Sequence, residues 1–404
     1  MPELVKKNLL GCFTLLPIEA VHYGAGSVAG LQASLASSGV QRALLITGNT
    51  IATRTDLVER VKVAAGGRIA GVFHETIQHV SRESVLRAAE QAREMGADGI
   101  VSLGGGTPND TGKAVLMALA EDFRTPADFD RVRVKFEYPS SVEVPSIKGQ
   151  TLPMMAVSTT LSAGEFTHFA GVTDTARQVK DLYIDRKLAA RAVVLDPELT
   201  LDTPLWLWLS TGMRAVDHCV ESLCSTNSHP FTDALATQAL SMLARYLREC
   251  HADPKDLSAR THAHVAAWMS VCGLANVNLG LSHGIGHQLG ARSNVPHGIT
   301  SCVMMYPVMN WNSIYVSPRQ ADIARALGVD TTGMDLGEAA ASGREAVLQL
   351  VKDLDLPWRL QDVGVARDEF AALAKDAMDD LIVATNPRPV NSVDDVIAVL
   401  ESAW

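Results

Sequence analysis

The chain has 404 residues, of which 47% are hydrophobic and 20% charged, and its 35 Lys and Arg against 45 Asp and Glu give a net charge of −10. This length suits two domains that each bury a core. The negative charge and the lack of a Lys/Arg cluster exclude the electrostatic footprint of nucleic-acid binding. No apolar run reaches the roughly 20 residues of a membrane-spanning helix, and the start, MPELVKKNLLGCF, lacks the apolar core of a secretory signal. We therefore expect a soluble, cytoplasmic protein without a membrane partner.

The six cysteines are dispersed along the chain and form no C-x-x-C pair. This distribution is typical of reduced thiols within a core. We expect no disulfide framework.

The first half of the chain alternates short apolar runs with helical stretches, which favours a parallel sheet with crossover helices. One of these stretches, 81–94, begins at Ser81 as a capping residue and has amphipathic spacing. The expected strands are ALLITG (43–48), AGVFH (70–74), DGIVSL (98–103), PMMAV (153–157), DLYI (181–184) and RAVVLD (191–196).

After Pro204 the hydrophobic spacing becomes helical throughout. We expect an α/β, Rossmann-like nucleotide-binding domain over 1–200 and an all-α catalytic and substrate domain over 201–404, with a ligand cleft where the two meet. The predicted helices are 205–224, 231–250, 257–278, 318–327, 336–354 and 367–380.

A glycine-rich segment, DGIVSLGGGTPNDTGKAVLMALA, runs from a strand through Gly104, Gly105 and Gly106 into a helix expected to start near Asp110. Glycines allow the backbone to approach a pyrophosphate, and a helix N-terminus presents unpaired N–H groups to an anion. Neither the Walker pattern nor G-x-G-x-x-G is present. From the loop alone, a tight turn without a ligand remains an alternative.

The segment GGGTPNDTGKA resembles the GGGS-x-x-D-x-x-K loop of the iron-containing alcohol dehydrogenase superfamily. This resemblance extends over nearly the whole chain and implies a dehydroquinate-synthase-like two-domain architecture. Further similar segments follow in the family's order: YGAGSVAGL (23–31), STTLSAGEFTH (158–168), VVLDPELTLDTP (193–204), GMRAVDHCVES (212–222), LSHGIGHQLGARSNVPHG (281–298) and NPRP (386–389).

The resemblance implies a nicotinamide cofactor bound by the first domain. In the family an Asp often comes directly after the residue that matches Thr47, where it binds the adenosine ribose and repels a 2′-phosphate, but Gly48 stands there in this chain. We therefore expect both NADH and NADPH to be used. The implied cofactor-binding residues are Gly48, Asn49, Gly104, Gly105, Gly106, Thr107, Asp110, Lys113, Thr159 and Thr160.

Histidines gather in the second half of the chain. His283 and His287 lie four residues apart, as on one helix face, and His297 follows on a separate segment. Upstream, the spacing of the apolar residues in 206–220 leaves a second face that carries Arg214, Asp217, His218 and Glu221. Such a cluster predicts a catalytic site.

In the family an Asp and three histidines bind a divalent metal, and His218, His283 and His297 occupy the histidine places. The Asp place is taken by Arg214, whose guanidinium repels a cation and cannot ligate it. We therefore expect no metal. Iron or zinc held by the three histidines with water is the alternative. The shortened TTLSAGEFT segment resembles that of the metal-independent branch with the maleylacetate reductases, whereas P-H-G resembles that of the metal-dependent enzymes.

These features predict an NAD(P)H-dependent oxidoreductase that reduces a small carbonyl compound, expected to carry a carboxylate, or oxidises the matching alcohol. Arg214 would polarise the carbonyl or grip the carboxylate, and His287, with His218 or His283, would relay the proton. A salt bridge from Arg214 to Asp217 is the alternative role of Arg214.

Three other readings stay open: a metal-dependent alcohol dehydrogenase, a non-redox lyase or cyclase that uses bound NAD, and a binding protein without activity. The resemblance also implies a homodimer or larger homo-oligomer. Residues expected to line the substrate site are Phe166, His168, Trp208 and Arg292.

Overall fold

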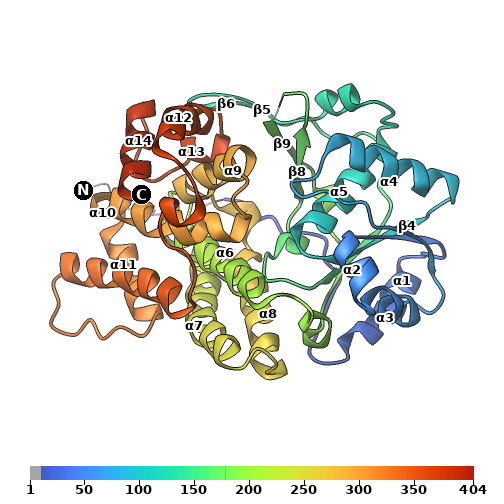
Figure 1. The fold of residues 1–404 in the computed structure, drawn as a ribbon, viewed down its shortest axis with the longest axis horizontal. Coiled ribbons are helices and arrows are strands. Elements are labelled where there is room, and N and C mark those ends of the chain that lie inside the picture. Colours follow the sequence, from blue (N-terminus) through green and yellow to red (C-terminus); the bar gives the residue numbers. More distant parts are fainter. Residues whose placement is uncertain (1–10, 178) are drawn as a thin grey trace.

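The computed structural model describes residues 11–177 and 179–404, so most of the start MPELVKKNLLGCF lies outside the described residues. Two bodies of different architecture lie side by side (Figure 1). One, coloured blue to green, combines a sheet with helices, and the other, yellow-green to red, is helical. This arrangement confirms the predicted fold class.

The first body is built on a six-stranded sheet in which every neighbouring pair of strands is parallel. All residues of the four inner strands are buried, which explains why those segments are apolar runs without alternation. In sheet order the strands are β1 (Ala20–Tyr23), β10 (Ala192–Leu195), β7 (Met154–Ser158), β4 (Gly99–Gly104), β2 (Ala43–Thr47) and β3 (Ile69–Phe73).

Helices cover both faces of this sheet, with separate apolar clusters beneath them. The predicted N-cap is confirmed, because the Ser81 side chain accepts a hydrogen bond from the Ser84 N–H. The α-helices are α1 (Leu31–Ser37), α2 (Asn49–Arg54), α3 (Leu57–Ala64), α4 (Arg82–Glu94) and α5 (Gly106–Ala120).

The expected strand 181–184 does not join the parallel sheet. It belongs to β9 (Val179–Ile184), which pairs antiparallel with β8 (Phe169–Asp174) in a separate two-stranded hairpin. The buried Arg82 of α4 anchors this hairpin, with Nη2 2.7 Å from Asp181 and Nη1 3.0 Å from Asp174. A second small hairpin is formed by β5 (Lys135–Glu137) and β6 (Ser141–Glu143).

The second body packs its helices around one large apolar core, to which α6 contributes most of its surface. Its α-helices are α6 (Leu205–Cys224), α7 (Pro230–Ala252), α8 (Leu257–Val271), α9 (Leu281–Ser293), α10 (His297–Ala326), α11 (Leu336–Asp353), α12 (Phe370–Met378), α13 (Leu381–Ala384) and α14 (Val393–Ser402). Short 3₁₀ helices occur along the whole described chain: η1 (Ser27–Gly30), η2 (Pro126–Arg131), η3 (Gly164–Phe166), η4 (Arg186–Leu188), η5 (Pro197–Thr200), η6 (Leu274–Asn276), η7 (Leu360–Val363) and η8 (Arg367–Glu369).

Three helix predictions need correction. The stretch 318–327 is the end of α10, which is kinked at Val316, two residues before Pro318. The stretch 257–278 is helical only to Val271, before a turn into η6. The stretch 367–380 is a 3₁₀ turn followed by α12.

All six cysteines are unpaired. Among the described residues no single helix is long and apolar enough to cross a membrane, although the bent pair 257–276 and 281–293 meets the length and composition criteria together.

Candidate active site

The glycine-rich loop connects β4 to α5. Gly104 has φ +138°, a conformation that side chains disfavour, and a Cβ on Gly105 would lie 2.9 Å from the Thr160 side chain. Helix α5 begins at Gly106, four residues before the predicted start, and Gly105 provides no side-chain cap. The first N–H groups of α5 therefore remain free to bind an anion such as a pyrophosphate.

The expected contact of Lys113 with the cofactor is corrected by the structure. Lys113 is fully buried, and its Nζ donates to the Gly164 carbonyl at 2.6 Å, the Thr167 hydroxyl at 2.8 Å and the Phe169 carbonyl at 3.0 Å. An ammonium has three protons, so all of them are used within the protein. Lys113 thus fastens the loop after β7 to α5, and burial lowers its pKa to about 8.

The other predicted nucleotide residues lie at the C-terminal ends of neighbouring strands. Thr159 donates its N–H to the Gly104 carbonyl at 3.0 Å, which joins the loop after β7 to the glycine-rich loop. Asp110 accepts a hydrogen bond from the Gly171 N–H of β8 at 3.3 Å. Thr107, also on α5, is partly exposed beside them. Ligands of open α/β sheets bind at this edge.

Gly48 follows β2 and Asn49 begins α2. The backbone of Gly48 is extended, and a Cβ there would meet only the Thr76 hydroxyl, at 3.8 Å. The fold therefore has space for a side chain at this position.

In the helical body, α6, α9 and α10 bring together the predicted cluster. Arg214 of α6 is 5% exposed. Its Nη2 lies 3.1 Å from Nε2 of His297, the first residue of α10, and its Nη1 donates to the Ser301 hydroxyl at 3.1 Å. Arg214 Nη1 also lies 3.8 Å from Asp217 Oδ2, so the predicted salt bridge forms as a long contact beside these two bonds. Burial lowers the pKa of Arg214, while Asp217 and Glu221 act in the opposite direction.

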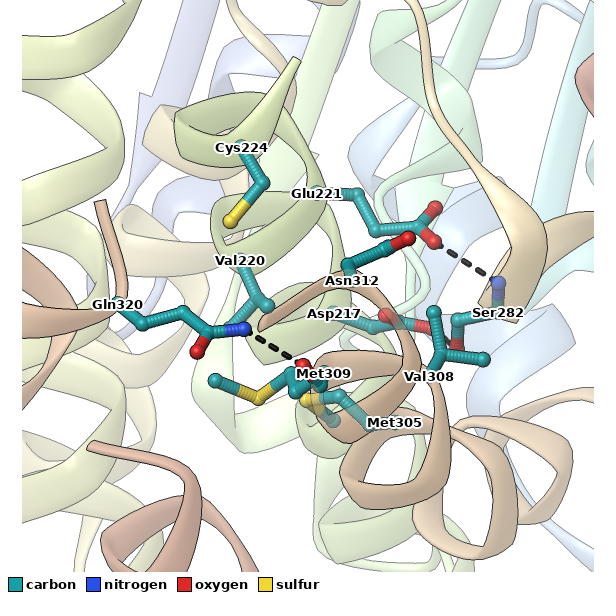
Figure 2. A pocket seen from close by; sticks show the side chains of 10 residues that line it. All are labelled: Asp217, Val220, Glu221, Cys224, Ser282, Met305, Val308, Met309, Asn312 and Gln320. Atoms are coloured by element: carbon teal, nitrogen blue, oxygen red, sulfur yellow. Dashed lines mark hydrogen bonds between the residues drawn. The ribbon is translucent and has the colours of Figure 1, made fainter. Parts of the chain in front are cut away.

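Two buried carboxylates support the start of α9. Glu221 accepts the N–H groups of Gly280 and Ser282, both at 2.8 Å, and thereby caps the helix from outside (Figure 2). Glu221 Oε2 also lies 2.7 Å from His283 Nδ1. Burial raises the pKa of Glu221 to about 6. Asp217 Oδ2 accepts from the hydroxyls of Ser282 at 2.8 Å and Ser301 at 2.7 Å.

The four histidines form two ring pairs. The rings of His218 and His283 lie 5.0 Å apart, and those of His287 and His297 stack at 5.4 Å with an angle of 6°. Burial lowers the pKa of His218, His283 and His297 well below the ordinary value, which favours neutral imidazoles. His287 is partly exposed, with Nδ1 2.7 Å from Asp380 Oδ2.

A small cavity is lined by Asp217 and Glu221 together with Cys224, Met305 and Asn312 (Figure 2). Its volume is about 10 Å³, which is room for roughly one water molecule. Asp217 Oδ1 is buried without a hydrogen-bond partner in the described residues. The cavity is too small for a substrate.

Sequence reasoning missed four residues of this region. Lys180 of β9 comes close enough to Asp110 and Arg214 for both to influence its pKa, which burial lowers, and Gly171 leaves space for its side chain. His79 has φ +66° and joins the two bodies through a 3.3 Å contact with Asn294. Asp380 and Asn386 come from the C-terminal segment. No sequence pattern indicates the unusual backbone conformation of His79. The NPRP motif contains Asn386, but the sequence alone gives that residue no role.

Asn386 fixes the beginning of α9. Its Oδ1 accepts the Leu281 N–H at 3.1 Å, and its amide nitrogen donates to Asn312 at 2.7 Å and to the Arg388 carbonyl at 2.7 Å. The NPRP segment thereby holds the helix that carries His283 and His287.

Two of the four residues expected to line the substrate site lie in the core instead. Trp208 is fully buried in the core against His264, and Phe166 is buried in a stack with Trp268. Arg292 pairs with Asp376 of α12 at 2.6 Å. Only His168 of this set remains partly exposed without an ion pair.

The chain matches two family profiles: "Iron-containing alcohol dehydrogenase" over residues 19–197 and "Fe-containing alcohol dehydrogenase family, C-terminal" over residues 208–404. The chain belongs to the iron-containing alcohol dehydrogenase family. Members of this family are oxidoreductases that act on alcohols and aldehydes with a nicotinamide cofactor, and the chain is one of them.

Individual members of the iron-containing alcohol dehydrogenase family align over almost the full length. Lactaldehyde reductase of Escherichia coli (strain K12) is 31% identical over 389 residues, covering 96% of this chain and 98% of the relative. Maleylacetate reductase of Burkholderia cepacia is 30% identical over 387 residues, covering 96% of each chain. The crystal structure of a 1,3-propanediol oxidoreductase has a TM-score of 0.89 and 27% identity, covering 98% of this chain and 100% of that one.

The residues of this chain do not fit the iron that gives the family its name. The nitrogen of His297 that would face an ion accepts a hydrogen bond from the Arg214 guanidinium instead. A permanent cation at this distance repels a second cation. In another group of possible ligands, Asp217, Glu221 and His283, the Asp217 Oδ2 atom, both Glu221 oxygens and His283 Nδ1 already make hydrogen bonds around α9.

Proposed function

We propose that the chain is a metal-independent carbonyl reductase similar to the maleylacetate reductases. It transfers a hydride from NADH or NADPH to a small carbonyl compound that carries a carboxylate, or catalyses the reverse oxidation. The observation that carries this proposal is the position of Arg214, whose buried guanidinium lies 3.1 Å from His297 Nε2 and so supports a role for Arg214 in place of a metal.

Reduction of a carbonyl requires stabilisation of negative charge on oxygen, and a fixed cation in a buried site provides it. Arg214 has two nitrogens committed, to His297 and Ser301, so its orientation is held before the substrate arrives. The same guanidinium suits a two-point contact with a carboxylate.

The proton that complements the hydride comes from a histidine. His287 is the member of the cluster that is both partly exposed and stacked on His297, so it can exchange protons with solvent and with a substrate held at Arg214. His218 and His283 are buried behind it and would assist as neutral relays.

The first body supplies the cofactor site through the ends of β2, β4 and β7. The free N–H groups at the start of α5 would receive the pyrophosphate, with Gly104, Gly105 and Gly106 allowing its close approach. No carboxylate follows β2, since Gly48 stands there, so the 2′-phosphate of NADPH meets no repulsion at that position.

A metal-dependent alcohol dehydrogenase is the second candidate. It is favoured by the presence of all three family histidines in this region, where buried His218 and His283 lie ring to ring and partly exposed His297 stacks on His287. In that case the histidines would hold the ion with water, and Arg214 would have to turn away.

One experiment separates these candidates. Metal content is measured on the purified protein, together with NAD(P)H-linked carbonyl reduction before and after chelation, for the parent and for Arg214→Ala and Arg214→Lys. We expect metal well below one equivalent, activity that survives chelation, and a loss of activity in Arg214→Ala that Arg214→Lys partly restores. About one equivalent of metal with chelator-sensitive activity would contradict the proposal. Product formation without net cofactor turnover would indicate the non-redox class.

A further inference from the structure

The ring of His287 is fixed by a carboxylate from the far end of the chain. His287 Nδ1 lies 2.7 Å from Asp380 Oδ2, and the two side chains are 26% and 13% exposed. Asp380 is the N-cap of α13, where its Oδ1 accepts the Ile382 N–H at 2.9 Å. One oxygen of Asp380 therefore caps α13 and the other contacts His287, so the carboxylate cannot rotate without losing one of these bonds.

The ring of His287 is also held on its face. It stacks on His297 at 5.4 Å with nearly parallel planes, and His297 accepts the hydrogen bond from Arg214. The contacts run from Asp380 through His287 and His297 to Arg214. This sequence of contacts links a carboxylate in the C-terminal segment with the proposed electrophile on α6.

We propose that Asp380 is a positioning residue that keeps the proton of neutral His287 on Nδ1 and leaves Nε2 to exchange a proton with the substrate oxygen. This inference rests on the proposed role of His287. A carboxylate accepts but does not donate, so the imidazole nitrogen facing it must carry hydrogen. The same arrangement stabilises the imidazolium that forms when Nε2 is also protonated.

The proton balance follows from this tautomer. In alcohol oxidation the hydride passes from the substrate carbon to the nicotinamide, the hydroxyl proton passes to Nε2, and the imidazolium then releases that proton to water. In carbonyl reduction the imidazolium gives the Nε2 proton to the oxygen while the carbon receives the hydride.

The substitution Asp380→Asn distinguishes the proposed effect of Asp380 on the His287 ring from its role as the N-cap of α13. Asparagine is as good an N-cap as aspartate, so its Oδ1 can keep the bond to Ile382, while its NH₂ group then faces His287 Nδ1. A donor at this position forces the neutral ring into the opposite tautomer. We expect kcat to fall by about ten- to a hundredfold, with the Kd of NADH and the thermal midpoint close to the parent values.

A matched control is Asp376→Asn, which removes a carboxylate from α12 that pairs with Arg292 of α9 but does not touch His287. We expect this variant to keep the parent kcat. Asp380→Ser is the second test variant, because serine caps a helix well but is too short to reach the imidazole. It should lose kcat to a similar extent even where Asp380→Asn folds poorly.

A double-mutant cycle with His287→Ala shows whether Asp380 acts through His287. If it does, Asp380→Asn lowers kcat in the parent and changes it less than about twofold in the His287→Ala background. Equal losses in both backgrounds, or full kcat in Asp380→Asn and Asp380→Ser, would overturn the inference. Full activity of His287→Ala would instead overturn the proposed role of His287, so the two failures are distinguishable.

Discussion

The Nη2 atom of Arg214 lies 3.1 Å from the Nε2 atom of His297. The imidazole lone pair that could bind a metal ion therefore accepts a hydrogen bond from a cation of the protein itself. His218 and His283 remain buried nearby, with His218 Nδ1 and His283 Nε2 lacking hydrogen-bond partners among the described residues. The proposed absence of a metal therefore depends on one residue of α6, Arg214.

This relationship predicts that Arg214→Asp creates a metal site. The substitution removes the cation and places a carboxylate one helical turn before His218, beside His283 and His297. After dialysis against Zn²⁺ we expect about one bound equivalent, measured by elemental analysis, against almost none for the parent. Arg214→Asn is the control, since it removes the charge without supplying a carboxylate, and it should bind zinc more weakly. Equal metal content in Arg214→Asp and the parent would refute the prediction.

Replacing Lys113 should lower the stability of the protein more than it weakens cofactor binding. Lys113→Met removes the Nζ donor from the Phe169 carbonyl and the Thr167 hydroxyl, while the Gly164 carbonyl keeps its bonds from the Thr167 N–H and hydroxyl. Lost donors to buried acceptors cost about 1–3 kcal/mol each, so we expect the free energy of unfolding to fall by about 2 kcal/mol or more, measured by chemical denaturation. The exposed Lys62, paired with Glu59, is the control, and Lys62→Met should cost less than about 1 kcal/mol. Unchanged stability of Lys113→Met would be inconsistent with its buried contacts.

Gly48→Asp should shift the preference from NADPH toward NADH. The site has space for the side chain, because the nearest atom to a Cβ there is 3.8 Å away. A carboxylate near the 2′-phosphate would repel it. We expect kcat/KM for NADPH to fall at least about tenfold, equivalent to about 1.4 kcal/mol, with a smaller change for NADH. Gly48→Asn has similar size without charge and should keep the parent ratio. A parallel loss for both cofactors would speak against an electrostatic effect.

His264 should make the helical body sensitive to acid. Burial, with Arg260 nearby, lowers the pKa of His264 to about 3, whereas an unfolded histidine has a pKa of about 6.5. Between these values the unfolded chain binds one more proton than the folded chain, so this contribution is constant above pH 6.5 and stability is lost as pH falls below it, by about 1.4 kcal/mol per pH unit. The unfolded imidazole is already half-protonated at pH 6.5, so the loss between pH 6.5 and pH 5.5 is about 1 kcal/mol. Denaturant titrations at these two pH values should show a loss that is smaller by about this amount in His264→Phe. Identical pH slopes for the two proteins would contradict the assignment.

The sequence predicted helix α6 with its observed ends, 205–224, because apolar residues every three and four positions leave only one face for Arg214 and His218. The four fully buried parallel strands could be predicted equally well, since such strands are apolar runs bounded by turns, whereas the partly buried edge strand β1 was not among the expected strands. The segment 181–184 has the same composition, but its partner β8 is chosen by a turn and by the ion pairs of Arg82, which local spacing does not encode.

Site residues could be predicted where a sequence motif contains them, but not where only a tertiary contact brings them to the site. Lys113 occupies a recognisable position, yet the spacing does not tell whether its side chain turns toward the ligand or into the protein. Asp380 contacts His287 across 93 residues, and one carboxylate among many in an acidic chain has no local signal. Burial, which makes Trp208 a core residue, likewise emerges only from the packing of α6 against α8.

The Asn386 bond to the Leu281 N–H has a consequence for the order in which the protein matures on the ribosome. The sheet is complete once β10 has been made, and α6 follows directly after it. Glu221 can support the start of the helix that presents His283 and His287 as soon as that helix is made, but the bond to its Leu281 N–H forms only when residue 386 has left the exit tunnel. A nascent chain therefore has all strands of its parallel sheet long before the last of the contacts that fix the start of α9.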